Sequence, residues 1–61
     1  MYFNDYQVGD RAEVISTSFD TDKRQLYGRV GEIINIKGSS LRLRFDDGYE
    51  TWLPVEDCVE Y

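Results

Sequence analysis

The chain has 61 residues and a formal net charge of -5, with no histidine and one cysteine. A chain of this length forms one domain that buries only about 60% of its unfolded surface, which leaves no room for a second lobe or a deep cleft. The missing histidines and the single Cys58 exclude a disulfide framework and a Cys/His zinc site within one chain. We therefore expect one domain over residues 1 to 61 that is not an enzyme and holds neither a cofactor nor a metal.

The first residues show neither the basic start nor the apolar run of a signal peptide, and no segment has the length and apolarity of a membrane span. One cysteine without a partner fits a reducing compartment, so we expect a cytoplasmic protein. The charge is segregated along the chain. Residues 23 to 44 contain six basic residues against Glu32, whereas residues 45 to 61 contain six acidic residues and no basic one. The negative total argues against indiscriminate binding of nucleic acid.

The first seven residues contain three aromatic residues without clear periodicity, Tyr2, Phe3 and Tyr6. We expect an N-terminal arm over residues 1 to 7, from which one or two of these rings cover the open end of a small core. Residues 8 to 11 have the composition of a turn, because glycine and aspartate favour turns. They lead into a short strand over residues 12 to 16, in which alternation directs Ala12 and Val14 inward.

The stretch over residues 16 to 25 is polar and irregular, and Phe19 is its one large apolar residue. A loop of this length in a small domain is more often functional than accidental. A helix is the alternative, but the β-branched and aspartate-rich composition disfavours it. We therefore expect a long loop between the first strand and the second.

Two glycines three residues apart follow this loop, Gly28 and Gly31, and they predict tight packing or a bulge. The apolar residues of the next segment, residues 32 to 36, cannot all lie on one side of a regular strand. A bulge near Ile33 and Ile34 resolves this conflict. The polar segment over residues 37 to 40 then has the composition of a turn.

A complete β-hairpin is predicted over residues 41 to 54. Leu41, Leu43 and Phe45 alternate with polar residues, which is the pattern of a strand with one buried face. We expect a three-residue loop that ends at Gly48, because a two-residue loop would place Glu50 opposite Phe45 in the core. The preferred register pairs Phe45 with Tyr49, Leu43 with Thr51, Leu41 with Leu53, Arg44 with Glu50 and Arg42 with Trp52. It predicts an ion pair, a cation–aromatic pair and an outward-facing Trp52.

The end of the chain completes the predicted fold. Pro54 has no N–H group to donate and ends the ladder, residues 55 to 58 suit a single helical or 3-10 turn, and residues 58 to 61 a last short strand. The expected fold class is all-β. We expect five strands that close into a small barrel, with a short 3-10 turn before the last strand, because a lone open sheet of this size would expose its apolar face and its edges.

Four sequence features resemble an SH3-like small barrel: the Gly9-Asp10-Arg11 turn, the Gly28-Arg29-Val30-Gly31-Glu32-Ile33 step, the Leu-Arg-Leu-Arg-Phe hairpin and the closing residues 52 to 59. The resemblance covers about residues 8 to 61. Within that group the chain is similar to the SH3-like repeats of the Mind bomb ubiquitin ligase, to KOW modules and to PsaE-type barrels. The resemblance to SH3 domains implies that Pro54 and Trp52 stand at analogous peptide-binding positions, but Asp57 or Cys58 stands where those domains have a tyrosine. The resemblance to KOW modules implies contact with RNA or with proteins of transcription and translation.

The candidate binding residues are Trp52, Arg42 and Arg44, because aromatic residues and arginine contribute most of the binding energy at protein interfaces. Tyr27 and Phe19, in and beside the long loop, are expected to extend this surface. The alternative is that Trp52 simply covers the side of the barrel and that Phe19 anchors the loop to the core. We expect the partner to be another protein.

Two other functions remain open from the sequence. The basic residues of the middle third can line a phosphate-binding face, with Trp52 and Tyr27 for stacking, as in a KOW-like nucleic-acid or ribonucleoprotein binder. The acidic residues can instead mimic nucleic acid and inhibit a basic partner protein. The simplest interpretation is that these acidic residues are solvated surface residues without a binding role. Cys58 falls within an apolar alternation, so we expect it to be a small buried hydrophobic residue.

Overall fold

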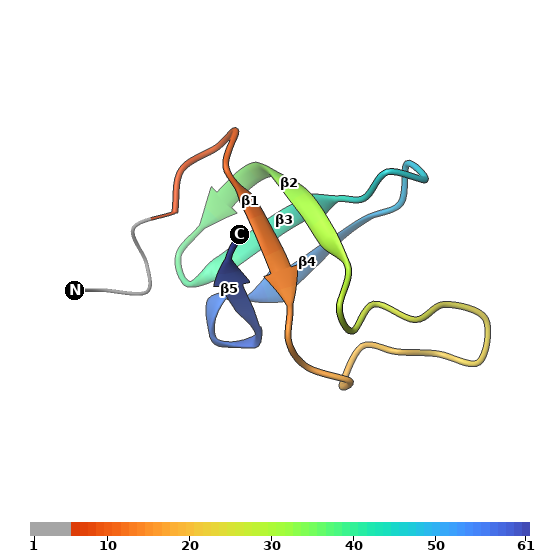
Figure 1. The fold of residues 1–61 in the computed structure, drawn as a ribbon. Coiled ribbons are helices and arrows are strands. Elements are labelled where there is room, and N and C mark those ends of the chain that lie inside the picture. The colour runs from red at the N-terminus through yellow and green to blue at the C-terminus, as the bar shows by residue number, and fades with distance from the viewer. Residues whose placement is uncertain (1–5) are drawn as a thin grey trace.

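The computed structural model describes residues 6 to 61, and these residues form one antiparallel sheet (Figure 1). In chain order the elements are β1 (Arg11–Val14), β2 (Val30–Lys37), β3 (Ser40–Arg44), β4 (Glu50–Pro54), the 3-10 turn η1 (Val55–Asp57) and β5 (Cys58–Glu60). The strand order in the sheet is β4-β3-β2-β1-β5. The predicted all-β class, the five strands and the 3-10 turn before the last strand are therefore confirmed. The first strand is shorter than predicted and ends at Val14.

The core lies on the inner face of this sheet. Ala12 and Val14 of β1 are fully buried, as their alternation predicted, and so is Ile33 of β2. Cys58 is 5% exposed and belongs to the same cluster, which confirms its prediction as a small buried hydrophobic residue. The remaining buried members are Leu26, Leu41, Leu43, Phe45, Leu53 and Val55.

The predicted bulge in β2 is present. Ile33 pairs with Leu43 and Asn35 with Arg42, so Ile34 is the inserted residue. Residues 33 and 36 would point to opposite faces of a regular strand, because side chains alternate with a period of two. The extra residue restores a common face: Ile33 is buried and Ile36 packs against the core cluster.

Two glycines lie around the start of β2, and each is required for a different structural reason. Gly28 has a φ of +84°, a left-handed conformation that favours glycine. Gly31 has ordinary backbone angles, but a Cβ there would lie 3.1 Å from Cβ of Leu43 and 3.2 Å from Cδ1 of Phe45. The step therefore combines one turn with one close approach of β2 to the core side chains of the hairpin.

Within residues 6 to 61 the ladder of strand pairs does not close, and β4 and β5 remain the two edges of the sheet. η1 joins these edge strands directly, while the segment between β1 and β2, drawn in yellow in Figure 1, extends away from the sheet. The predicted N-terminal arm lies mostly outside the described residues; Tyr6 packs against the core cluster. None of the helices in residues 6 to 61 has the length and apolarity needed to cross a membrane.

Candidate functional site

The hairpin formed by β3 and β4 has the register that the sequence predicted. Leu41 pairs with Leu53 and Leu43 with Thr51, while Arg42 is opposite Trp52 and Arg44 opposite Glu50. The loop is the predicted three-residue loop over residues 46 to 48, and Phe45 N–H donates to Tyr49 C=O at 2.9 Å. Gly48 closes the loop with a φ of +89°, a conformation that would strain any other residue type.

This register places four polar or aromatic side chains on the outer face of the hairpin. We call Arg42, Arg44, Glu50 and Trp52 the hairpin outer face. Arg42 donates to Oε1 of Glu50 at 2.8 Å, and Arg44 donates to Oε2 of the same carboxylate at 3.1 Å. Trp52 is 38% exposed. One carboxylate is thus shared by two guanidinium groups, which gives these four residues a net charge of +1.

The predicted contact between Arg42 and Trp52 is replaced by this shared ion pair. The two residues are cross-strand neighbours, but the Arg42 guanidinium is directed to Glu50. Among residues 6 to 61 the cation–aromatic contacts are instead those of Arg24 with Tyr49 and of Arg29 with Phe45. The predicted ion pair between Arg44 and Glu50 is present. The indole of Trp52 therefore keeps an exposed surface.

The other two candidate residues lie on the segment between β1 and β2. Tyr27 is 50% exposed. Phe19 is half-buried and packs against the core cluster, so its ring anchors the loop, as the alternative interpretation expected. The hairpin outer face lies on β3 and β4, whereas Tyr27 lies in the segment between β1 and β2. Polar contacts link this segment to the hairpin.

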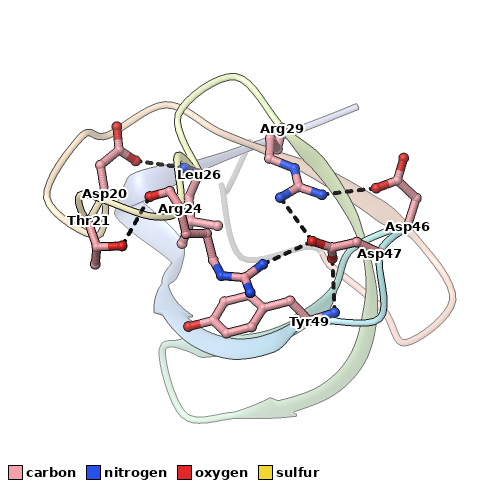
Figure 2. A network of polar contacts seen from close by, with 8 residues as sticks. All are labelled: Asp20, Thr21, Arg24, Leu26, Arg29, Asp46, Asp47 and Tyr49. Atoms are coloured by element: carbon pink, nitrogen blue, oxygen red, sulfur yellow. Dashed lines mark hydrogen bonds and ion pairs between the residues drawn. The ribbon is translucent and has the colours of Figure 1, made fainter.

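That link is a network of ion pairs between the long loop and the hairpin turn, which we call the loop–turn clamp (Figure 2). Arg24 donates to Oδ2 of Asp47 at 2.9 Å, and its guanidinium carbon lies 3.8 Å from the centre of the Tyr49 ring. Arg29 donates to Oδ1 of Asp46 at 2.9 Å and lies 3.5 Å from Oδ2 of Asp47. Two arginines of the loop thus meet two aspartates of the turn.

The loop also has order of its own. Oδ1 of Asp20 accepts hydrogen bonds from the backbone N–H groups of Leu26 at 2.7 Å and of Tyr27 at 3.0 Å. Thr21 and Arg24 form an isolated antiparallel bridge, in which Thr21 N–H donates to Arg24 C=O at 2.7 Å. These bonds place the buried Leu26 in the core and aim Arg24 at the turn. The helix that we considered for residues 16 to 25 is not formed.

Sequence reasoning missed the loop–turn clamp. From the sequence, Asp46 and Asp47 belong to the predicted hairpin turn and to the solvated acidic residues, and Arg24 and Arg29 belong to the basic middle segment. The partners are 23 and 17 residues apart in the chain. The only sequence signal for these ion pairs was that the chain has basic residues in the long loop and acidic residues in the hairpin turn. That signal does not say which arginine pairs with which aspartate.

The network also changes the electrostatics of the turn. The backbone N–H of Tyr49, followed by the Arg24 and Arg29 guanidinium groups, holds the pKa of Asp47 below its usual value, against a smaller opposing effect of burial. Four of the six basic residues between positions 23 and 44 are engaged in ion pairs, namely Arg24, Arg29, Arg42 and Arg44. The basic segment is therefore largely neutralised within the molecule.

Covalent and metal chemistry have few candidate groups. Burial, together with the nearby charge of Asp57, raises the pKa of the Cys58 thiol to about 11, so this cysteine is a poor nucleophile near neutral pH. Within the described part of the chain, no three acidic or cysteine side chains lie close enough to hold a metal ion.

A surface pocket of about 560 Å³ lies beside the hairpin outer face. Arg44 lines it together with Arg11, Glu32 and Tyr61. The register places Arg11, Glu32, Arg44 and Glu50 in one row across four strands, so charge alternates along that row. The pocket is open to solvent and is lined by residues of both charges. Because Arg44 belongs to both, the pocket adjoins the hairpin outer face.

Comparisons of the chain with protein-family models, with curated proteins and with solved structures found no match.

Proposed function

We propose that this chain is a non-enzymatic, SH3-like small barrel of the cytoplasm that binds another protein through the hairpin outer face. The observation that carries the proposal is the exposed indole of Trp52 on an edge strand, 38% accessible beside two arginines that share one carboxylate. Tryptophan and arginine are the residue types most enriched among the energetically important positions of protein interfaces. A large apolar side chain held at the surface between fixed charges has the composition of such a position.

The fold supports the SH3-like part of the proposal. Five short antiparallel strands, a long loop after the first strand and a 3-10 turn directly after Pro54 are consistent with the architecture that the sequence resemblance implies. The three residues of η1 connect the edge strands β4 and β5, so the two edges of the sheet are close together in the sequence. The inner face of this one sheet holds the buried core, as expected of a small barrel that has no second layer.

The ion pairs support the choice of protein binding over nucleic-acid binding in this proposal. Phosphate binding draws on exposed, unpaired Lys and Arg side chains. Within residues 6 to 61 the four arginines of the middle segment bind carboxylates, and Lys23 and Lys37 are its remaining basic residues. Mimicry of nucleic acid is weakened for the same reason, since Asp46, Asp47 and Glu50 are neutralised by those arginines.

The test uses the immobilised full chain to capture proteins from a native lysate, with and without nuclease. The double variant Trp52→Ala with Arg42→Ala is compared with Val59→Ser, which alters a side chain of similar exposure, 40%, on the opposite edge of the sheet. We expect a nuclease-resistant partner that the double variant loses and Val59→Ser keeps, while all three proteins unfold cooperatively. Equal capture by the double variant would exclude the hairpin outer face, and nuclease-sensitive capture would favour the nucleic-acid function.

A further inference from the structure

The backbone of β4 presents free hydrogen-bonding groups at the edge of the sheet. In an antiparallel pair, opposite residues alternate between hydrogen-bonded and non-hydrogen-bonded pairs. Phe45 N–H donates to Tyr49 C=O, so the alternation makes Thr51 the next residue of β4 that bonds to β3. The N–H and C=O groups of Glu50 and Trp52 therefore point away from β3. Among residues 6 to 61, no strand lies beyond this edge.

Both ends of this open edge are closed to further pairing. Pro54 occupies the next outward-directed position of β4 and has no N–H group to donate. At the other end, the N–H group of Gly48 already donates to Phe45 C=O at 3.0 Å within the hairpin turn. The groups available to an added strand are therefore those of Glu50 and Trp52, and Thr51 is the centre of this short segment.

Two copies of this edge fit each other in one antiparallel register. A two-fold axis at Thr51 places Glu50 of each copy opposite Trp52 of the other, and both pairs are then hydrogen-bonded pairs that use every outward group of the segment. A register centred on Trp52 would leave Glu50 opposite Pro54, which has no donor. A register centred on Glu50 would leave Trp52 opposite Gly48 and bring two carboxylates face to face. The register centred on Thr51 is therefore the most complete.

The outer-face side chains also match in this register. Each Glu50 carboxylate lies beside the indole of the other copy and not beside a second charge. The next residue along that row is Arg42 of the second copy, which is opposite its own Trp52. The charges along the row thus keep alternating in sign. In order, the row contains Arg11, Glu32, Arg44 and Glu50 of one copy, followed by Trp52 and Arg42 of the second copy.

The exposed indole has a counterpart across the two-fold axis. The two Trp52 residues are diagonal neighbours on the outer face, at a separation of about 7–8 Å that aromatic side chains can bridge. Each indole, 38% exposed in the single chain, then covers part of the other. On the inner face the two Thr51 residues are directly opposite each other as a non-hydrogen-bonded pair, a favourable position for β-branched side chains.

The other edge of the sheet is a poorer site for a second copy. Ile15 N–H donates to Asp57 C=O, so the outward groups of β5 are those of Cys58 and Glu60. A two-fold axis between these two residues would place the carboxylate of Glu60 opposite the buried Cys58. Tyr6, whose pKa is raised by burial and then by the charges of Cys58 and Glu60, also lies beside this edge.

We propose that a second copy of this chain binds at the edge of β4, so that two five-stranded sheets join into one continuous antiparallel sheet with a two-fold axis at Thr51. The interface is isologous, because the same segment of each copy forms both sides. It covers an edge that an unpaired strand would otherwise present to other chains. The inference goes beyond the proposed function and does not depend on it, because pairing uses the backbone of β4 and leaves both hairpin outer faces on one surface.

The contact is small, so we expect a reversible dimer of low affinity. Backbone pairing over residues 50 to 52, the two indoles and the Thr51 pair bury less area than a standard interface. Two chains of net charge -5 also repel each other at long range. We therefore expect a dissociation constant of about 0.1–1 mM in about 0.3 M salt, which screens this repulsion.

The first test uses the natural full chain. Sedimentation equilibrium from about 0.05 to 2 mM should show a monomer–dimer equilibrium. In a mixture of ¹³C-labelled and unlabelled chains, NMR should show an intermolecular nuclear Overhauser effect between the two Thr51 Hα atoms, which face each other in the register centred on Thr51. A chain that stays monomeric over this range, an oligomer larger than a dimer, or a dimer without that effect would overturn the inference.

The second test identifies the edge by a backbone substitution in the chemically synthesised chain. Replacing the amide at residue 52 by an ester removes the outward N–H of Trp52 from each copy but keeps the indole, and an ester at residue 60 is the matched control on the β5 edge. We expect the residue 52 ester to weaken the dimer by about 25-fold, for two lost hydrogen bonds, and the residue 60 ester to leave it unchanged. Equal dissociation constants for the two esters, or a dimer weakened only by the residue 60 ester, would overturn the inference.

Discussion

The guanidinium group of Arg24 lies 3.8 Å above the centre of the Tyr49 ring and donates a hydrogen bond to Asp47, two residues earlier, at 2.9 Å. One side chain of the long loop thus contacts both the ring and the carboxylate of the hairpin turn. Stacking on Tyr49 fixes the plane of the guanidinium, and the ion pair fixes its direction. This contact ties the loop to the hairpin, which contains the candidate binding residues.

Arg24→Ala is expected to loosen the long loop more than it lowers global stability. An exposed cation–aromatic contact and a surface ion pair are each worth about 0.5–1 kcal/mol, so the loss in the free energy of unfolding should be about 1 kcal/mol. Amide hydrogen exchange at residues 20 to 27 should accelerate, while exchange in β2 and β3 should change only with global stability. Lys23→Ala is the control because Lys23 makes no ion pair among the described residues. Unchanged loop exchange in Arg24→Ala would show that the clamp does not order the loop.

Asp20→Ala is expected to be more costly than Arg24→Ala. Its carboxylate accepts two backbone N–H groups, those of Leu26 and Tyr27, and hydrogen bonds to a charged group contribute about 1.5–3 kcal/mol. Leu26 is buried, so its N–H has little access to water as a replacement. Urea unfolding followed by the fluorescence of the single tryptophan measures the loss. Asp22→Ala, a nearby exposed aspartate, should lie within about 0.5 kcal/mol of the natural chain, and equal effects of the two changes would contradict this role.

Gly31→Ala is expected to destabilise the fold by about 1–3 kcal/mol, the usual cost of overpacking a core. The new Cβ would lie 3.1 Å from Cβ of Leu43 and 3.2 Å from the backbone C=O of Arg44, and neither atom is at the flexible end of a side chain. Thermal unfolding monitored by circular dichroism checks this expectation. Glu32→Ala, at the exposed neighbouring position of β2, should unfold close to the natural temperature. A Gly31→Ala protein as stable as this control would show that β2 can move away from the hairpin at no cost.

Acid should weaken the contacts of Asp47, first the hydrogen bond that it accepts from the Tyr49 N–H and then its ion pairs in the loop–turn clamp. Its folded pKa lies below its usual value of 3.8, so its contribution to stability is fully present above the unfolded pKa and is lost as pH falls through the folded pKa. The difference in unfolding free energy between the natural chain and Asp47→Asn should therefore be constant at pH 6 to 5 and should shrink below about pH 4. A difference that grows on acidification would have the wrong sign for this mechanism.

Cys58 gives the opposite behaviour at alkaline pH. Its folded pKa is raised from 9.0 to about 11, so the folded chain keeps the thiol neutral while the unfolded chain ionises it. The contribution of this group is present below pH 9 and is lost as pH rises toward about 11. The native thiol should react slowly with iodoacetamide at pH 8, and in urea it should react quickly. The free energy of unfolding is measured between about pH 8 and 11 for the natural chain and for Cys58→Ala, which has the same tyrosines and so separates the effect of the thiol from tyrosine titration. The same decline in both proteins would contradict the prediction.

Local pattern was enough to predict much of this fold. The alternation of Leu41, Leu43 and Phe45 and the turn ending at Gly48 determined the hairpin register, because a shift by one residue would have buried Glu50. The bulge at Ile34 followed from a face conflict within five residues, and the 3-10 turn followed from Pro54. Each of these depends on neighbours in sequence or on a single paired strand, where period and turn chemistry are sufficient.

The tertiary structure decided which charges meet. Arg24 and Asp47 are 23 residues apart and Arg29 and Asp46 are 17 apart, and charge attraction has no periodicity that selects one partner over another. Arg42 likewise binds Glu50 and does not stack on Trp52, its cross-strand neighbour. The register was predicted correctly, but this contact depends on how far the side chains reach across the hairpin. Sequence alone therefore established that Trp52 lies on the outer face; the fold decided that its indole remains uncovered there, because the nearest guanidinium groups are held by a carboxylate.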